Sequence, residues 1–247
     1  MINIVTLFIW FAIYSFLGWV WETTFCSIRA GHFINRGFLN GPIIPVYGFG
    51  AVFVMLAMNF ARNSALPTHL PYVDIPLVFL GGMIICTILE YVTAVILESA
   101  FHIRWWDYSK QKFNFQGRIC LKSALFFGLM SVLIIYIVQP LVSSATVNIP
   151  ADIADPLALV FLILLGTDLA VTLSSLVHLK SRLSAVHHRM EHAAEELYED
   201  AEEFRDDVFA AFSRGKRQIL RLAKAYPGSV SRHHDAAWQK IKEHAGK

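Results

Sequence analysis

The sequence predicts an all-α, polytopic membrane protein. It has five transmembrane helices with the N-terminus outside and the C-terminus inside, followed by a long cytoplasmic amphipathic helix. Three observations predict this class: five long apolar segments, basic residues confined to alternate loops, and a charged tail with helical periodicity. Of the 247 residues only 16% are charged, whereas soluble domains carry about 25%. Residues 1–179 hold only 8 of the 21 Lys and Arg residues. We therefore predict a transmembrane domain over 1–179 and a cytoplasmic helical tail over 180–247.

Five apolar segments are long enough to cross a bilayer, which requires about 20 residues for about 30 Å of hydrocarbon. Buried helices of soluble proteins rarely run this long without charges, which argues against a large soluble core. The first segment lacks the positively charged start of a signal peptide, so we expect it to be retained as a span. The predicted spans are 3–27, 42–61, 76–100, 119–141 and 155–179.

The loops between the spans predict their orientation, because short loops rich in Lys and Arg remain in the cytoplasm. Basic residues follow the first, third and fifth spans, whereas the loop after the second span has one and the loop after the fourth has none. A multi-pass protein of the cell membrane with a cytoplasmic C-terminal tail is therefore expected. The basic residues on the expected inner side are Arg29, Arg36, Arg104, Lys110, Lys112, Arg118, Lys180 and Arg182.

The tail changes in character. Through residues 179–212 apolar side chains recur every three or four positions, which predicts one apolar stripe on a long helix. The breaker segment 226–229 predicts the end of that helix, and a shorter helix is expected to reach about His244. The stripe is typical of a solvated amphipathic helix, a coiled coil or a docking helix. Residues 181–226 are thus candidates to contact a separate cytoplasmic protein, and the basic block 214–224 to contact anionic lipid.

Four carboxylic acids lie within the predicted spans. An ionisable group there costs about 2.5–3.5 kcal/mol on insertion scales and tends to face the protein interior. At 1.5 Å per residue, Glu90 lies about 21 Å and Asp168 about 20 Å from the outer ends of their spans. We interpret these two residues as a substrate- or ion-binding site, with Tyr91 and Thr87 as neighbouring hydrogen-bonding groups. The alternative is a hydrogen-bonded carboxylate pair, sharing a proton, that locks two helices together.

The other two acids, Glu22 and Glu98, lie near the expected cytoplasmic ends of their spans. Buried charges need partners, and the aromatic residues of the loop after the third span suit the headgroup region. We predict an interface cluster with a shaped polar site; the alternative is a set of ion pairs that only fixes helix packing. The predicted cluster comprises Glu22, Asn35, Arg36, Glu98, Trp106, Asp107, Tyr108, Asn114, Arg118 and Lys122.

The loop after the first span, residues 35–50, has four glycines and two prolines. Irregular backbone at membrane depth survives only against protein or water, so this loop is expected either to re-enter the membrane or to form an interfacial turn. Glu22-Thr23-Thr24-Phe25 at the end of the first span matches Glu98-Ser99-Ala100-Phe101 at the end of the third. The match predicts a tandem repeat of the kind that many transporters contain.

Four ordered motifs carry a family resemblance: GWVWE (18–22), NRGFLNGPIIPVYGFG (35–50), LEYVTAVILE (89–98) and RWWDYS…FNFQGRIC (104–120). Together they resemble the bacterial membrane family described as "putative ABC-transporter type IV", which has animal relatives among uncharacterised transmembrane proteins. The resemblance covers roughly residues 4–142 and implies a permease-like role without a defined substrate. The chain has no GxxxxGK[ST] motif, so any ATPase is expected to be a separate protein.

Three functions remain open from the sequence. The first is a transporter or permease-like component, and the second a membrane scaffold or regulator that recruits a partner through its tail. The third is an enzyme acting on a lipid headgroup, but the chain lacks an HExxH, GxSxG or paired-aspartate metal motif, which argues against catalysis. We predict no catalytic residues, no metal, no cofactor and no nucleic-acid partner. Besides the bilayer, a further copy of the chain is a possible partner.

Overall fold

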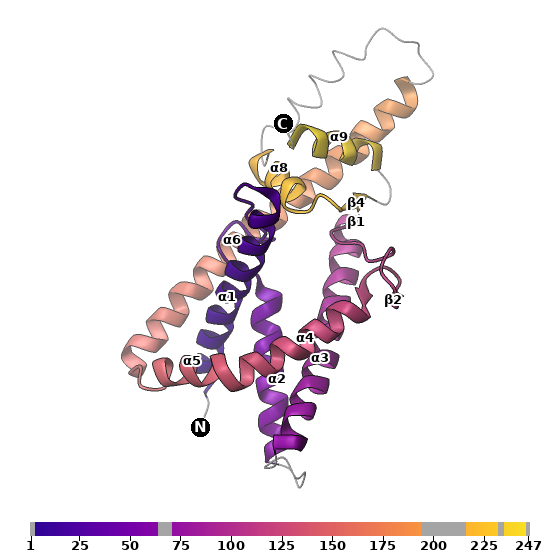
Figure 1. Cartoon of the computed structure of the whole chain (residues 1–247). Helices are drawn as coiled ribbons and strands as arrows, with labels where there is room; N and C mark the ends of the chain where they lie inside the picture. The colour runs from indigo at the N-terminus through magenta and orange to yellow at the C-terminus, as the bar shows by residue number, and fades with distance from the viewer. Residues whose placement is uncertain (1–2, 64–70, 194–215, 232–234, 246–247) are drawn as a thin grey trace. The chain divides into compact units, whose positions relative to one another are not determined.

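The computed structural model describes residues 3–63, 71–193, 216–231 and 235–245, and these are mostly helical (Figure 1). The side chains that form the predicted tail stripe, residues 179–212, lie outside the described side chains. The helices are α1 (Ile4–Ala30), α2 (Pro45–Arg62), α3 (Pro71–Phe101), α4 (Leu121–Leu133), the π-helix η1 (Ile134–Val138), α5 (Gln139–Thr146), α6 (Ala151–Ala193), α8 (Lys216–Ala225) and α9 (Asp235–Ala245). The strands are β1 (Ile103–Arg104), β2 (Asn114–Phe115), β3 (Ile119–Cys120) and β4 (Val230–Ser231).

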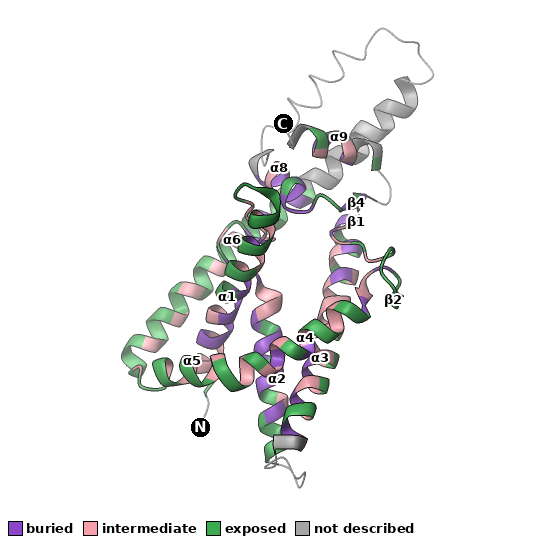
Figure 2. Cartoon of the chain, viewed as in Figure 1, coloured by how far each residue is buried: buried purple, intermediate pink, exposed green. Residues whose placement is uncertain are grey.

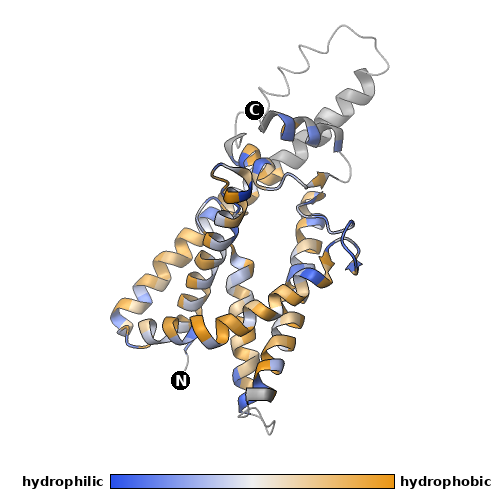
Figure 3. Cartoon of the chain, in the orientation of Figure 1, coloured by the Kyte–Doolittle hydropathy of each residue, from blue (hydrophilic) through white to orange (hydrophobic). Residues whose placement is uncertain are grey.

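Five helical stretches are long and apolar enough to cross a membrane, and each overlaps one predicted span. Figure 3 shows them mostly in the colours of hydrophobic residues. Much of this apolar surface is exposed (Figure 2): only 11% of the α6 stretch is buried. Soluble proteins rarely expose apolar patches of this size, so lipid is the solvent that suits these helices. The stretches are Ile4–Ala30, Pro45–Arg62, Val73–Phe101, Leu121–Thr146 and Ala151–Val177.

The chain divides into two compact units, and helices α1, α3 and α6 contribute residues to both. Unit 1 contains most of the apolar helices, and unit 2 contains the loop after α1, the end of α3 and the C-terminal part of the chain. Unit 1 comprises Met1–Glu22, Pro42–Ala94 and Asp107–Gly166. Unit 2 comprises Thr23–Gly41, Val95–Trp106 and Thr167–Lys247.

Unit 1 is held together by close helix packing at small residues. On α2, Gly48 lies against the Ser15 side chain of α1, and on α3, Gly82 lies against Ser131 of α4; neither position has room for a Cβ. In lipid there is no hydrophobic drive between helices, so small residues that allow close approach take over this role. Between α1 and the last part of the fourth span, Tyr14 donates a hydrogen bond of 2.7 Å to Gln139.

The fourth span contains a break in regular α-helix that the sequence did not predict. The π-helix η1 lies between α4 and α5 and ends one residue before Gln139-Pro140. Proline has no amide hydrogen to donate, and π turns commonly mark such local irregularities. The η1 residue Tyr136 donates to Asp74, which also pairs with Arg62 at 2.7 Å. These contacts join the end of α2, the start of α3 and η1 within unit 1.

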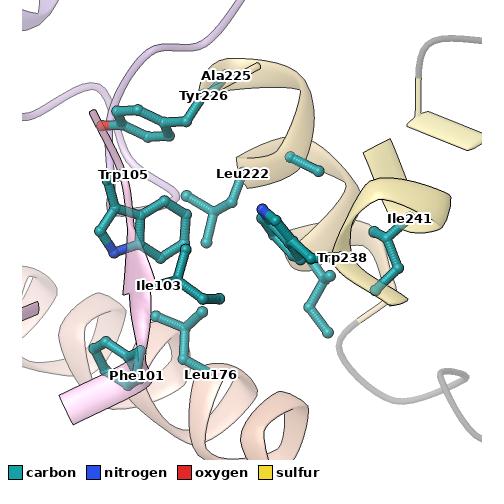
Figure 4. Close-up of a cluster of buried hydrophobic side chains, with 11 residues drawn as sticks. Phe101, Ile103, Trp105, Leu176, Leu222, Ala225, Tyr226, Trp238 and Ile241 are labelled. Atoms are coloured by element: carbon teal, nitrogen blue, oxygen red, sulfur yellow. The ribbon is translucent and has the colours of Figure 1, made fainter. Parts of the chain in front are cut away.

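Unit 2 has an aromatic core supplied by segments that lie far apart in the chain (Figure 4). Strand β1 pairs antiparallel with β4, with Ile103 opposite Ser231. Trp238 of α9 is fully buried and donates to Ser229 at 3.0 Å. The predicted break at 226–229 is confirmed, since α8 ends at Ala225 and a turn leads through β4 to α9. The C-terminal residues therefore pack on the end of α3 and on α6.

Candidate functional site

Glu90 lies on α3 in unit 1 and is held by hydroxyl groups. Its Oε1 accepts a hydrogen bond from the Tyr108 hydroxyl at 3.1 Å. Its Oε2 lies 3.2 Å from Oγ of Ser123, in the first turn of α4. Among the described residues, Glu90 has no ion pair with a lysine or arginine. Within the described residues, this carboxyl group in an apolar helix thus has neutral hydroxyl partners and no cationic one.

The Ser123 hydroxyl gives this cluster two hydrogen-bonding arrangements. Ser123 Oγ also lies 3.0 Å from the backbone carbonyl of Cys120, and a hydroxyl has a single hydrogen to donate. When that hydrogen goes to Cys120, the contact with Glu90 is a hydrogen bond only if the carboxyl group carries a proton and donates it. When Ser123 donates to Glu90, the carboxylate can be charged. The geometry therefore accommodates both the neutral and the ionised Glu90.

Tyr108 remains a neutral donor in this cluster. Burial raises the pKa of the Tyr108 phenol, and the Glu90 carboxylate raises it further. The Glu22 carboxylate acts on the pKa of Tyr108 in the same direction, which places Glu22 within electrostatic range of this group. The phenol therefore keeps its proton at physiological pH and can donate to Glu90 in either charge state.

The loop that carries Tyr108 is shaped by its own polar side chains. Asp107 accepts from both the backbone and the hydroxyl of Ser109, at 3.0 and 2.6 Å. Asn114 donates to the carbonyls of Ser109 and Gln111 and accepts from the Gly117 amide. Such side-chain-to-backbone bonds replace regular secondary structure in turns. In unit 1, Asp107 and Asn114 thus order the loop that presents Tyr108.

A short hairpin closes the same loop. Strand β2 pairs with β3, and the turn between them contains Gln116 and Gly117, both with positive φ. A non-glycine residue in this conformation is uncommon and is often found at functional sites. The Gln116 side chain accepts from the Tyr91 hydroxyl at 3.1 Å and from Arg118. The Arg118 guanidinium also lies 5.8 Å from the centre of the Tyr91 ring.

Thr87 lies one helical turn before Glu90 on α3. Its hydroxyl oxygen is buried, and among the described residues it has no hydrogen-bond partner. Buried hydroxyl groups are nearly always bonded, so an exception in a protein needs a reason. Of the predicted site residues, Thr87 is the one whose buried hydroxyl oxygen has no hydrogen-bond partner in the described part of the chain.

Asp168 lies on α6 in unit 2 and is surrounded by donors. Its Oδ1 accepts from the amide and the side chain of Asn40, both at 2.9 Å, and from the Thr172 hydroxyl at 3.3 Å. Its Oδ2 accepts from the Gly41 amide at 2.7 Å. Hydrogen bonds of this kind favour the ionised carboxylate over the protonated form. The Asp168 side chain thereby fixes the loop after α1 to α6.

The rest of the predicted interface cluster is divided between the units. In unit 2, Glu98 pairs with Arg104 at 3.3 Å and is almost fully buried. The Asn35 side chain accepts from the Gly37 amide and so shapes its own loop. Trp106 packs at the edge of the aromatic core. In unit 1, Lys122 is exposed at the start of α4.

Several contact residues were missed by the sequence reasoning. Ser123 is an ordinary residue of the first turn of α4, and no feature of the sequence marks it. Asn40-Gly41 is a typical turn pair, which was a usable signal for a loop that offers backbone amides. No pattern in the sequence indicated its partner 128 positions away. The other missed residues are Gln218 and Arg221, which contact the loop from α8.

These features define the class of the protein: a multi-pass helical membrane protein with five apolar helices, each long enough to span the bilayer. The chain belongs to the family described as "Putative ABC-transporter type IV", whose family model matches residues 9–173. That match covers the apolar helices and both carboxylates, and it ends before α8. No curated protein and no solved structure matches the chain. The family match and the five apolar helices fit a transporter-like membrane protein.

Proposed function

We propose that the protein is a transporter component in which Glu90 binds and releases a proton within the apolar helices. The observation that carries the proposal is the hydrogen bonding of Glu90, which has hydroxyl partners suited to both of its charge states. A carboxylate permanently needed for helix packing would be expected to have a cationic partner or several amide donors instead. Acids inside membrane helices often mark substrate or ion pathways and proton relays.

The groups around Glu90 also offer a place for a transported solute. The hydroxyls of Tyr108 and Ser123 contact the Glu90 carboxyl group. One helical turn away lies the Thr87 oxygen, which has no hydrogen-bond partner among the described residues. Hydroxyl and carboxyl oxygens are suitable partners for an amine, an amide or a hydroxylated solute. The substrate class we propose is therefore a small polar molecule whose passage is coupled to the protonation of Glu90.

Proton coupling can be tested without knowing the solute. The purified protein is reconstituted in vesicles that enclose a pH-sensitive dye, and the outside solution is acidified in the presence of a small-metabolite extract. The expected result is faster internal acidification than in empty vesicles, and a return to the empty-vesicle rate in Glu90→Gln. The matched control is Asp152→Asn, an exposed acid at the start of α6. Wild-type rates in Glu90→Gln would refute the proposal.

Orientation is a separate proposal. We place the N-terminus outside and residues 216–245 in the cytoplasm. The support is the basic residues that follow the first, third and fifth apolar stretches in the sequence. A single-cysteine variant at exposed Lys224, in a background without the native cysteines, is the probe. A membrane-impermeant thiol reagent should label it only after intact cells are opened. Labelling of intact cells would reverse the assignment.

A further inference from the structure

The loop after α1 is held on one side by the C-terminal helix α8. The Arg221 guanidinium donates through Nη1 to the Gly37 carbonyl at 2.5 Å and through Nη2 to the Phe38 carbonyl at 2.9 Å. The Tyr226 hydroxyl donates to the Arg36 carbonyl at 2.9 Å. Three consecutive carbonyls of the loop are thus bonded by two side chains of the C-terminal segment. These carbonyls are not bonded within a helix or strand, and the side chains of Arg221 and Tyr226 supply their hydrogen bonds instead.

The contact is reciprocal, since the loop also binds the end of α8. The Arg36 side chain donates to the Ala225 carbonyl, which is the last residue of α8. Its guanidinium lies 4.3 Å from the centre of the Tyr226 ring. A cation at a helix C-terminus interacts favourably with the helix dipole, and a guanidinium over an aromatic face gains further attraction. The docked position of α8 is therefore specified by contacts in both directions.

On its other side the same loop is fixed to Asp168, and Thr172 joins the two contacts. Thr172 is fully buried. Its hydroxyl donates to Asp168 at 3.3 Å and accepts from Asn40 at 3.2 Å and from the Gln218 side chain of α8 at 3.3 Å. A continuous hydrogen-bonded network therefore runs from α8 to the carboxylate on α6. Such networks are cooperative, and loss of one member weakens the others.

The two side chains that hold the loop from α8 and from α6, Arg221 and Asp168, carry opposite charges. Among the described residues Arg221 has no direct ion pair, and its Nε is buried without a hydrogen-bond partner. Burial lowers the pKa of the Arg221 guanidinium, whereas Tyr226 and the Asp168 carboxylate act in the opposite direction. A half-buried cation and a half-buried anion that hold the same loop, linked by polarised amide and hydroxyl groups, attract one another more strongly than they would in bulk water.

We propose that Asp168 and Arg221 form an indirect ion pair, bridged by the loop 36–41 and Thr172, that latches the C-terminal module 216–245 onto this loop. Docking of the module then favours binding of the loop to Asp168, and binding of the loop to Asp168 favours docking of the module by the same free energy. A protein or lipid that draws the module away would release the loop from α6. The C-terminal segment thereby regulates a loop of the family-matched region, independently of Glu90.

Hydrogen–deuterium exchange of the full chain in lipid nanodiscs tests this coupling. Asp168→Asn removes the anion from α6, and the expected result is exchange about fivefold faster or more, both in peptides from 36–41 and in peptides from 218–226, as typical couplings give. Arg221→Ala should affect the same two segments. Lys224→Ala is the matched control, because Lys224 is exposed on the same helix. Unchanged exchange at 218–226 in Asp168→Asn would overturn the latch.

A second variant guards against general loss of folding. Thr172→Val keeps the shape of the side chain and removes only the shared hydroxyl, so both segments should again exchange faster. Peptides around Glu90 in unit 1 report whether the fold is intact, and their exchange should remain at the wild-type rate. If Thr172→Val accelerates 36–41 but leaves 218–226 unchanged, the network is not continuous and the proposal fails.

Discussion

Glu90 and Asp168 are carboxylates in apolar helices that differ in the groups that hold them. Asp168 receives two backbone amides, a side-chain amide and a hydroxyl, all from residues of unit 2. In the part of the chain that the structure describes, the hydrogen-bond partners of Glu90 are the hydroxyls of Tyr108 and Ser123 in unit 1. Amide N–H groups are donors only, whereas a hydroxyl can donate or accept. On our proposal, the donors around each acid, more than its depth in the helix, distinguish the anchor Asp168 from the proton carrier Glu90.

The comparison can be broken most strongly at Asp168. Asp168→Asn places an amide nitrogen or an uncharged oxygen against donors that now serve a carboxylate, and loss of hydrogen bonds to a charged group costs about 1.5–3 kcal/mol. We expect a large fall in the thermal unfolding temperature. Tryptophan fluorescence of the protein in detergent measures this transition. Asp152→Asn should leave the transition unchanged. A fall no larger than in Glu90→Gln would show that the two carboxylates are equivalent.

Thr172→Val sharpens the same side of the comparison. The substitution leaves Asn40 bonded to Asp168 but removes the shorter of two contacts of the Gln218 amide and one donor of Asp168. Loss of buried hydrogen bonds of this kind costs about 1–2 kcal/mol. The unfolding temperature should therefore fall between those of Asp168→Asn and wild type. Thr172→Ser, which keeps the hydroxyl, should recover most of the loss.

Tyr108→Phe tests the role of the hydroxyl groups that contact Glu90. The ring remains, while the donor to Oε1 of Glu90 is removed, at an expected cost of about 1 kcal/mol. Because that donor serves the charged carboxylate, Glu90 should then spend more time protonated. The measurement is the rate of proton release after a pH jump, followed by a soluble indicator dye. A rate identical to that of wild type would separate Tyr108 from the proton site.

The smallest effect is expected for Glu90→Gln. A glutamine side chain can accept from Tyr108 through its oxygen and donate to Ser123 through its nitrogen, so both present contacts survive. We expect the free energy of unfolding to change by less than about 0.5 kcal/mol, as for a substitution that keeps its hydrogen bonds. Chemical unfolding in mixed micelles measures it. A loss of several kcal/mol would identify Glu90 as a structural residue.

The apolar spans could be predicted because each one is fixed by its own composition. The break at 226–229 and the helix α9 were equally local, since Pro227-Gly228 interrupts a helix whatever its surroundings. The π-helix η1 was not predictable in the same way, because its residues Ile134–Val138 are uniformly apolar and only packing partners distinguish π from α geometry. The predicted tandem repeat, the partner-binding segment 181–226 and the homo-oligomer stay predictions.

The two acids of the candidate site could be predicted from the sequence, but the residues that donate hydrogen bonds to them could not. Rise per residue placed Glu90 and Asp168 at similar depth, and this suggested one shared site. Depth along a helix axis does not specify which side chains face the acid, and the donors Asn40 and Ser123 lie 128 and 33 positions away. An ion-binding role for Asp168 and the Tyr91 contribution to binding remain predictions; the hydrogen bonds of Asp168 favour an anchoring role.

Modification by a hydrophobic carbodiimide tests the central distinction most directly, because the reagent reacts with protonated carboxyl groups in apolar surroundings. The full-length protein in nanodiscs is treated at neutral pH, digested and analysed by mass spectrometry. The account predicts modification of the peptide containing Glu90, none of that containing Asp168, and loss of the signal in Glu90→Gln. Modification of Asp168 with Glu90 unmodified would contradict it.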